Sequence, residues 1–525
     1  MPKFGFAIDN RACIGCHACT VACKSEHEVP IGVNRTWVKY IEKGEFPNTK
    51  RSFNVQRCNH CVDAPCVEIC PVTSLYIRPD GIVDFDNERC IGCKACMQAC
   101  PYDALYLDPD TLTAAKCNYC THRVDQGIEP ACVVVCPVEA IVSGDLDDPT
   151  SKISLLDLGQ RVQYPKVEKN TKPKLFYVGG ETAALDPAAA PPREDYLWSA
   201  GAAVTLGVNK KSLSLADDES NEEARARRVY DQKKKPVIWG WMVSAYITTK
   251  AIAAGIPIIT FIMFALGITQ SPLPLSAAIA SVLCLGITGY LLVADLTQPK
   301  RFLYVLLRPQ WNSWLVRGAY IITAFGLGIP VVWITGNYVA NYGVKFGFAL
   351  VLALFAMATA GYTALLFAQA RGRDYWQSPL LIVSMVVDAL AAGVAACLLL
   401  GLMNWLGGTM MVFTAPNESV QVSAGTHTDP ARIAIGIALI LLVLVQLAEL
   451  LPQHQTKNAE LTAHAIVRGE FAGWFWIGAV AIGLAVPLGL VLFGGSLKLA
   501  AVLLLIGIAA KNHVLVQAPQ RVPLS

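Results

Sequence analysis

Four groups of four cysteines constrain this chain more than any other feature of its sequence. Of 18 cysteines in 525 residues, 16 lie between positions 13 and 136. Two groups follow the spacing C-x2-C-x2-C-x3-C, and the other two widen one interval. Three thiolates two residues apart can surround one iron–sulfur cubane, while the fourth points at a neighbouring cluster. The sixteen residues are Cys13, Cys16, Cys19, Cys23, Cys58, Cys61, Cys66, Cys70, Cys90, Cys93, Cys96, Cys100, Cys117, Cys120, Cys132 and Cys136.

Other uses of clustered cysteines fit these groups less well. A disulfide framework belongs to an oxidising compartment and usually follows a secretory signal. The residues before Cys13 contain neither an apolar signal core nor a twin-arginine pair, so we expect nothing to be cleaved from them. Zinc sites use pairs of C-x2-C without the third and fourth cysteines seen here. Because every group keeps four thiols, we predict four [4Fe–4S] clusters and no [3Fe–4S] cluster.

The two halves of the sequence differ in character. Residues 1–180 are polar and rich in Cys, Gly and Pro, whereas residues 237–518 consist of long apolar runs. Each run is long enough to cross a hydrocarbon core of about 30 Å as a helix. The eight predicted spans are 237–267, 274–296, 314–336, 346–370, 379–404, 430–452, 472–494 and 497–518.

Short local patterns complete the predicted fold. Residues 76–84 predict a β-hairpin with a Pro-Asp-Gly turn, as in a bacterial ferredoxin, and residues 174–178 predict a further strand. Residues 181–236 favour a flexible connector over a strap that lies on one domain. We therefore predict an α+β double bacterial-ferredoxin-like iron–sulfur domain (1–180), a linker (181–236) and an all-α eight-helix transmembrane bundle (237–525).

The distribution of basic residues predicts the orientation of the bundle. With eight spans both chain ends lie on one side, and that side carries fourteen Lys and Arg near the spans against three on the other. The positive-inside rule then places both termini and the cysteine-rich domain in the cytoplasm, with the spans in the inner membrane. Because the basic residues cluster beside apolar spans, nothing indicates nucleic-acid binding.

Polar residues within apolar spans are costly in lipid and are therefore functional candidates. We select Lys250, Asp295, Arg317 and Asp388 as a candidate quinone and proton site, and note Glu449 and Lys511 in later spans. The alternatives are snorkelling to the interface or mutual pairing, such as Asp295 with Arg317. Most of these residues fall in the cytoplasmic half of their spans, on the side of the cysteine-rich domain.

Aromatic and histidine residues of the membrane half suggest simpler roles. Trp239, Trp241 and Tyr246 are expected to act as interfacial anchors more than as quinone contacts. A membrane haem with two axial histidines needs two His within spans, and only His513 lies in one, whereas His464 is expected in a loop. We therefore expect no haem, so that quinone would meet the last cluster directly.

The cysteine-rich half resembles a known family of electron-transfer subunits. Cys13-Ile-Gly-Cys16-His-Ala-Cys19 and Cys90-Ile-Gly-Cys93-Lys-Ala-Cys96 carry the resemblance, together with Cys58-Asn-His-Cys61. They resemble the four-cluster iron–sulfur subunits of dimethyl-sulfoxide, polysulfide and formate-type molybdenum oxidoreductases. The resemblance implies four interlocked ligand sets: Cys13, Cys16, Cys19 and Cys136; Cys23, Cys117, Cys120 and Cys132; Cys58, Cys61, Cys66 and Cys100; and Cys70, Cys90, Cys93 and Cys96.

The apolar half resembles a second family. The segment from Ala294 to Phe302 (ADLTQPKRF), followed by Trp311-Asn-Ser-Trp314 and Arg317-Gly-Ala319, is similar to polysulfide-reductase membrane subunits of the NrfD type. That resemblance implies an eight-helix quinone site without haem, and a catalytic partner that contains molybdopterin. The two kinds of subunit are usually separate chains, and here they are joined.

Together these features predict an electron-transfer and quinone-reactive membrane subunit of a cytoplasm-facing oxidoreductase. The chain has no glycine-rich nucleotide fingerprint and no spare metal ligands, so substrate chemistry is expected on a partner chain. One alternative is a redox-driven proton-translocating subunit that uses Lys250, Asp388 and Lys511. Another is a passive membrane anchor without quinone chemistry.

Overall fold

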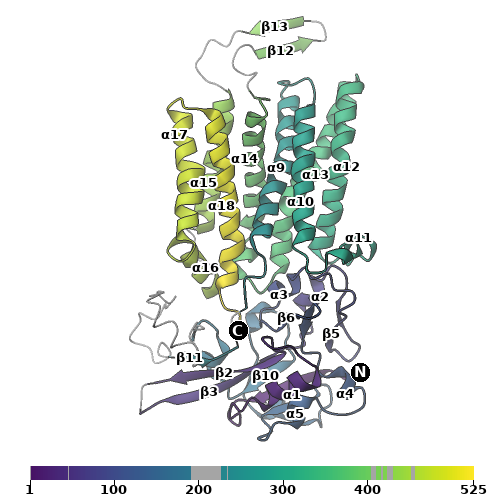
Figure 1. Ribbon diagram of the computed structural model, residues 1–525, viewed down its shortest axis with the longest axis vertical. Helices are drawn as coiled ribbons and strands as arrows, with labels where there is room; N and C mark the ends of the chain where they lie inside the picture. Colours follow the sequence, from purple (N-terminus) through teal and green to yellow (C-terminus); the bar gives the residue numbers. More distant parts are fainter. Residues whose placement is uncertain are drawn as a thin grey trace.

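A helical bundle stands on a small domain rich in loops (Figure 1). The computed structural model describes residues 2–44, 47–190, 226–232, 235–403, 410–415, 418–422, 430–450 and 456–525. The cysteine-rich domain lies at one end of the bundle, and the hairpin of β12 (Met410–Ala415) and β13 (Glu418–Val422) lies at the other. This architecture confirms the predicted fold class.

Short strands and single-turn helices frame the cysteine loops. A four-stranded sheet has the order β8-β1-β10-β9, in which β1 and β10 run parallel. The strands of this sheet are β1 (Phe4–Asp9), β8 (Ile141–Asp145), β9 (Val162–Gln163) and β10 (Leu175–Val178). Two hairpins, β4–β5 (Leu75–Ile77 and Val83–Phe85) and β6–β7 (Leu105–Leu107 and Ala114–Lys116), complete the ferredoxin-like part. The predicted hairpin and last strand are thus confirmed as β4–β5 and β10.

The first five helices of this domain begin within the cysteine loops. They are α1 (Ala18–Glu26), α2 (Pro65–Glu68), α3 (Ala95–Ala99), α4 (Thr121–Val124) and α5 (Ala131–Val134), whereas α6 (Lys152–Gly159) follows β8. Figure 1 places α2 and α3 next to the bundle and α1 and α5 on the far side of the domain.

The segment between the two halves contributes to the cysteine-rich domain at its described ends. Helix α7 (Thr182–Leu185) packs there, and β11 (Arg227–Tyr230) pairs with β2 (Thr36–Lys43), which in turn pairs with β3 (Lys50–Arg57). Glu42 on β2 forms an ion pair with Arg227 of β11, which holds β11 more firmly on β2. Composition favours a flexible connector. The described ends of this segment instead form a strap on the cysteine-rich domain, because the main chain of β11 pairs with β2.

Eight helical spans within the described residues are long and apolar enough to cross a membrane, as predicted. They are α9 (Trp241–Ala265), α10 (Leu275–Ala294), α12 (Trp314–Tyr338), α13 (Tyr342–Gln369), α14 (Leu380–Leu399), α15 (Pro430–Leu450), η6 with α17 (Trp474–Ala485 and Val486–Leu492) and α18 (Leu497–Gln517). The short helices α11 (Tyr304–Leu307) and α16 (Lys457–Val467) lie between spans. His464 is therefore helical and not in a loop, but it lies outside every span, as expected.

Helices α9 and α14 form the centre of the bundle and approach at a pair of glycines. A Cβ on Gly255 would overlap the main chain of Ala389 and Gly393, and a Cβ on Gly393 would overlap the main chain of Gly255. Small residues at such crossings let helices pack closely in membranes, where dispersion contacts drive association. The crossing therefore fixes how α9 is placed, and α9 carries Lys250 and one wall of the pocket described below.

Replacing Gly393 with alanine is expected to force α9 and α14 apart. Overpacking of this kind costs about 1–3 kcal/mol, so the midpoint of thermal unfolding in detergent should fall. Gly286→Ala on α10 is the matched control, because a Cβ there meets open space and alanine favours the helix. Equal midpoints for the two variants would contradict the inferred crossing.

Candidate cluster sites and membrane pocket

The cysteine loops share an unusual backbone conformation. His17 and Lys94 occupy equivalent positions in the first and third groups, and both have positive φ angles, 60° and 62°. His60 in the second group and Cys120 in the fourth are also left-handed, with φ of 42° and 53°. Non-glycine residues rarely adopt this conformation, and where they do the strain commonly serves a site. Each group therefore lies in a tightly curled loop that ordinary packing does not require.

The thiols of the first and fourth groups interlock. Burial raises the pKa of the Cys13 thiol, and the nearby thiols of Cys136 and Cys16 add to the rise. Burial likewise raises the pKa of the Cys23 thiol, together with its neighbours. Those neighbours are Cys117, Cys132 and Cys120. The last cysteine of each group thus lies among the first three of the other.

The second and third groups interlock in the same way. Burial raises the pKa of the Cys66 thiol well above its usual value, and the thiols of Cys100, Cys58 and Cys61 contribute. The pKa of Cys96 is raised by burial and then by Cys93, Cys90 and Cys70. These groupings correspond to the four ligand sets that the family resemblance implies, whose role as ligands stays a prediction.

The chemistry of this donor set fits iron–sulfur clusters. All sixteen cysteines are free thiols, and most are buried. Burial raises the pKa of Cys19 to about 11, so a thiolate here needs positive charge beside it. Iron supplies such positive charge, and hydrogen bonds donated to sulfur stabilise the thiolate further. His27 Nε2 lies 3.1 Å from the Cys120 sulfur, and the Ala140 amide donates to the Cys136 sulfur at 3.3 Å.

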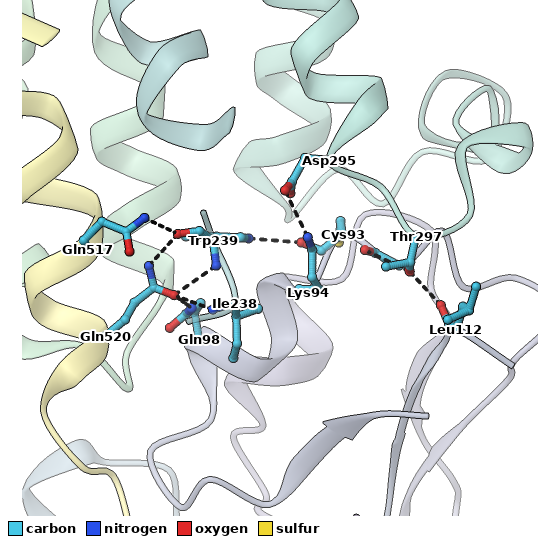
Figure 2. A network of polar contacts seen from close by, with 11 residues as sticks. Cys93, Lys94, Gln98, Leu112, Ile238, Trp239, Asp295, Thr297, Gln517 and Gln520 are labelled. Carbon is cyan, nitrogen blue, oxygen red and sulfur yellow. Dashed lines mark hydrogen bonds and ion pairs between the residues drawn. The ribbon is translucent and has the colours of Figure 1, made fainter. Parts of the chain in front are cut away.

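The loop that carries Cys93 docks on the bundle (Figure 2). The indole Nε1 of Trp239, just before α9, donates to the Cys93 carbonyl at 3.1 Å. Thr297 Oγ1 donates to the Leu112 carbonyl at 2.6 Å, and its side chain fills the space where Gly92 has no Cβ. Gly92 also has a φ of 69°, so this position accepts little else. Sequence reasoning missed Trp239 and Thr297 as docking residues.

A glutamine bridges three segments at the same interface. The Gln520 side-chain oxygen accepts from Gln98 at 2.6 Å and from the amides of Ile238 and Trp239 at 3.1 and 3.0 Å (Figure 2). Trp239 is 5% exposed and stacks on Phe367 and Trp376, so the expectation that it anchors at the membrane interface is wrong. Tyr246 is also buried, whereas Trp241 is exposed.

Two of the polar candidates, Asp295 and Arg317, lie at the bundle end near the cysteine-rich domain. Asp295 ends α10 and accepts an ion pair from Lys94 at 3.0 Å (Figure 2). It does not pair with Arg317, whose Nε donates to the Trp311 carbonyl at 2.7 Å and whose guanidinium lies over Trp314. The pair of Asp295 with Arg317 that the sequence suggested is therefore wrong. Asp295 pairs instead with Lys94, which belongs to the cysteine-rich domain.

The other two candidates lie deep in the bundle. Lys250 on α9 is 1% exposed, and its amine donates to Thr363 Oγ1 and, at 3.1 Å, to the Ala360 carbonyl of α13. Asp388 on α14 accepts an ion pair from Lys511 on α18 at 2.8 Å. The two candidates thus belong to separate contacts of the bundle core.

A pocket of about 740 Å³ opens on the outside of the bundle, between α9, η6 and α18. It lies towards the cysteine-rich domain, because Trp241 begins α9 and Trp474 begins η6. Helix η6 is a π helix, a rare form that is frequent at functional sites. The lining residues are Trp241, Ser244, Ala245, Thr248, Thr249, Gly473, Trp474, Ile477, Gly478, Ile482, Ile506, Ala509, Ala510 and His513.

The pocket wall is apolar apart from a few hydroxyls and one histidine. Ser244 Oγ is buried and has no hydrogen-bond partner among the described residues. Thr248 Oγ1 accepts from the Asn512 amide at 3.2 Å, and the His513 ring lies 4.9 Å from that of Trp474. None of the four polar candidates lines this pocket. The sequence signal for this pocket was a pair of hydroxyls four residues apart on α9, Ser244 and Thr248. A search for charged residues overlooked it.

Comparisons with known proteins agree with both halves of the structure. Residues 230–523 match the polysulphide reductase, NrfD family, and residues 49–146 match a 4Fe-4S dicluster domain. The chain therefore belongs to the NrfD polysulphide reductase family, as a multi-pass membrane protein with an iron–sulfur domain.

Several relatives match the cysteine-rich half of the chain. A polysulfide reductase component of Wolinella succinogenes is 42% identical over 35% of this chain and 98% of its own length. A tetrathionate reductase component of Salmonella typhimurium is 42% identical over 35% of this chain and 76% of its own. Protein NrfC of Escherichia coli is 43% identical over 34% of this chain and 80% of its own length.

The contact between Lys94 and Asp295 is expected to couple the two domains. Their side chains are 11% and 17% exposed, so Lys94→Met or Asp295→Asn alone leaves a poorly solvated charge. In a double-mutant cycle of unfolding in detergent, the coupling should be about 1–2 kcal/mol. The exposed pair Lys152–Glu139 is the control and should show no measurable coupling. Additive effects at Lys94 and Asp295 would argue against a docking role.

Proposed function

We propose that this chain is the electron-transfer and quinone-reactive membrane subunit of an oxidoreductase complex. It would relay electrons between the quinone pool and a catalytic partner, with the iron–sulfur domain and both termini in the cytoplasm and the spans in the inner membrane. One observation carries the proposal: the apolar pocket begins at Trp241, two residues after Trp239, which bonds to the loop of Cys93. A quinone in that pocket would lie near the cysteines closest to the membrane.

The sixteen cysteines are proposed to hold four clusters in the ligand sets stated above. When bound, each [4Fe–4S] cluster accepts and releases one electron at a time. The set of Cys70, Cys90, Cys93 and Cys96 lies at the membrane end, since Cys93 and Cys90 carbonyls accept hydrogen bonds from Trp239 and Arg301. The set that includes Cys16 lies at the opposite end, where α1 is far from the bundle (Figure 1).

The pocket has the composition expected for a quinone headgroup site. Ligand pockets are mostly apolar, with a few polar groups that orient the ligand. Its exposed wall residues, such as Trp474 and Ile477, would admit a lipid-soluble molecule from the side. The unpartnered hydroxyl of Ser244 and the ring of His513 would face the carbonyl oxygens of the headgroup.

Quinol oxidation releases two protons with its two electrons, and buried polar residues beside the pocket suit their transfer. Lys511 donates to both Asp388 and Ser384 at 2.8 Å, and Glu449 on α15 lies near enough to interact with Lys511. The next residue, Asn512, contacts Thr248 of the pocket wall. This arrangement also favours the second candidate function, redox-driven proton translocation. Lys250, Asp295 and Arg317 lie outside this group.

The catalytic partner is proposed to dock at the end far from the membrane. Exposed apolar residues, among them Ile14, Val21 and Val134, flank the exposed Cys16 and the half-buried Cys136. The relatives are components of polysulfide and tetrathionate reductases by name. The family resemblance of the sequence favours a molybdopterin-containing partner of that kind.

Filling the pocket is expected to block electron exchange with quinone. Ala509→Trp should slow reduction of the clusters by a short-chain quinol about tenfold or more, because the bulky ring occupies the headgroup space. Val502→Trp, on the exposed side of the same helix but outside the pocket, is the matched control. Stopped-flow absorbance checks the rate, with iron content confirming intact clusters. Wild-type rates in Ala509→Trp would remove the quinone assignment from this pocket.

Neutralising Asp388 is expected to slow quinol oxidation if it transfers protons. Asp388→Asn should lower the rate about tenfold or more, because proton transfer groups contribute at least that much. A triple variant, Asp388→Asn with Lys511→Met and Glu449→Gln, removes all three interacting charges together, so it separates proton transfer from stability. A triple variant as fast as wild type would show that this group of charges is structural.

A further inference from the structure

One buried arginine lies among the cysteines without an acidic partner. Arg57 ends β3, and its side chain is among the largest that are fully buried. Its Nη1 donates to the Cys132 sulfur at 3.0 Å, and its guanidinium lies 4.6 Å from the centre of the Phe6 ring. Its Nε and Nη2 have no hydrogen-bond partner among the described residues.

The charge of Arg57 is balanced by sulfur alone. No carboxylate in the described part of the chain forms an ion pair with it, and the groups that act on it are the thiols of Cys132, Cys117 and Cys19. An unpaired buried charge is strongly destabilising, so this position requires a negatively charged neighbour.

Arg57 contacts one ligand set and lies near a second. Cys132 and Cys117 belong to the set with Cys23, whereas Cys19 belongs to the set with Cys13. The basic residue at the membrane end is different, because Lys94, beside Cys93, is paired with Asp295. Arg57 therefore differs from Lys94 in having no carboxylate beside it among the described residues, and it lies beside the two sets far from the membrane.

We propose that Arg57 raises the reduction potentials of the clusters in these two sets. Reduction adds one negative charge to a cluster, and a fixed cation with N–H groups directed at sulfur stabilises the added charge. Arg57 thus makes the two clusters far from the bundle better electron acceptors than they would be without it. The inference rests on the proposed assignment of four clusters.

Redox titration of the purified full chain, followed by electron paramagnetic resonance, tests this role. Arg57→Gln should lower the potentials of two clusters so that the ratio of reduced to oxidised form falls at least tenfold, which is about 59 mV for a one-electron couple. Arg57→Lys keeps the charge but loses the planar donors, so its potentials should fall between those of Arg57→Gln and wild type. The cluster of the Cys93 set should shift least.

Lys39→Met is the matched control. Lys39 is a buried basic residue on the neighbouring strand β2, and the charged groups that act on it include no cysteine. Because burial lowers the pKa of Lys39 to about 7, the titrations are made at about pH 6, where its amine is charged. Its loss should leave all cluster potentials unchanged, whereas shifts equal to those of Arg57→Gln would overturn the proposal by showing a general effect of buried charge.

The remaining outcomes are also decisive. If Arg57→Gln assembles its clusters with unchanged potentials, the proposal is wrong. If it fails to assemble them, Arg57→Lys decides, because lowered potentials support the proposal and wild-type potentials overturn it. Fewer than four cluster signals in wild type would instead refute the proposed cluster count, and the shift of the remaining signals would still test Arg57.

Discussion

The contact of the Cys93 loop with Trp239, just before α9, and Thr297, just after α10, ties the two halves of this protein together. Trp239 bonds to the loop from one side, and Thr297 fills the space over Gly92 from the other. Gln520, Asp295 and Arg301 add polar contacts to the same interface. The membrane-end cysteines, the aromatic stack of Trp239 and the start of the pocket all take their places from this contact.

Most of the architecture could be predicted because strong, local signals encode it. Cysteine spacing is a covalent requirement of the cluster, so the four groups were visible without any structure. The eight spans were equally visible, since each had to be long and apolar. The predicted ends of the spans differ from the observed ends by a few residues. A helix such as α13 begins at its cap, Asn341, and hydropathy does not mark caps.

The site was harder to predict because its residues depend on neighbours distant in sequence. Asp295 looked like a membrane carboxylate, but its partner is Lys94, about two hundred residues earlier. Basic residues counted for orientation have a second role, since Arg301 and Arg371 bind the cysteine-rich domain. The pocket lacks charged residues altogether, so a search based on the cost of charge in lipid did not point to it.

The joining of the two halves in one polypeptide changes what their interface must achieve. The Wolinella relative is matched over nearly its whole length by the cysteine-rich half alone, so there the corresponding domain is a separate polypeptide. Here the strap of β11 leads directly into α9, and docking is an intramolecular step at high effective concentration. A modest set of polar contacts is then enough to keep the domains together at any expression level, and each bundle receives one relay of its own.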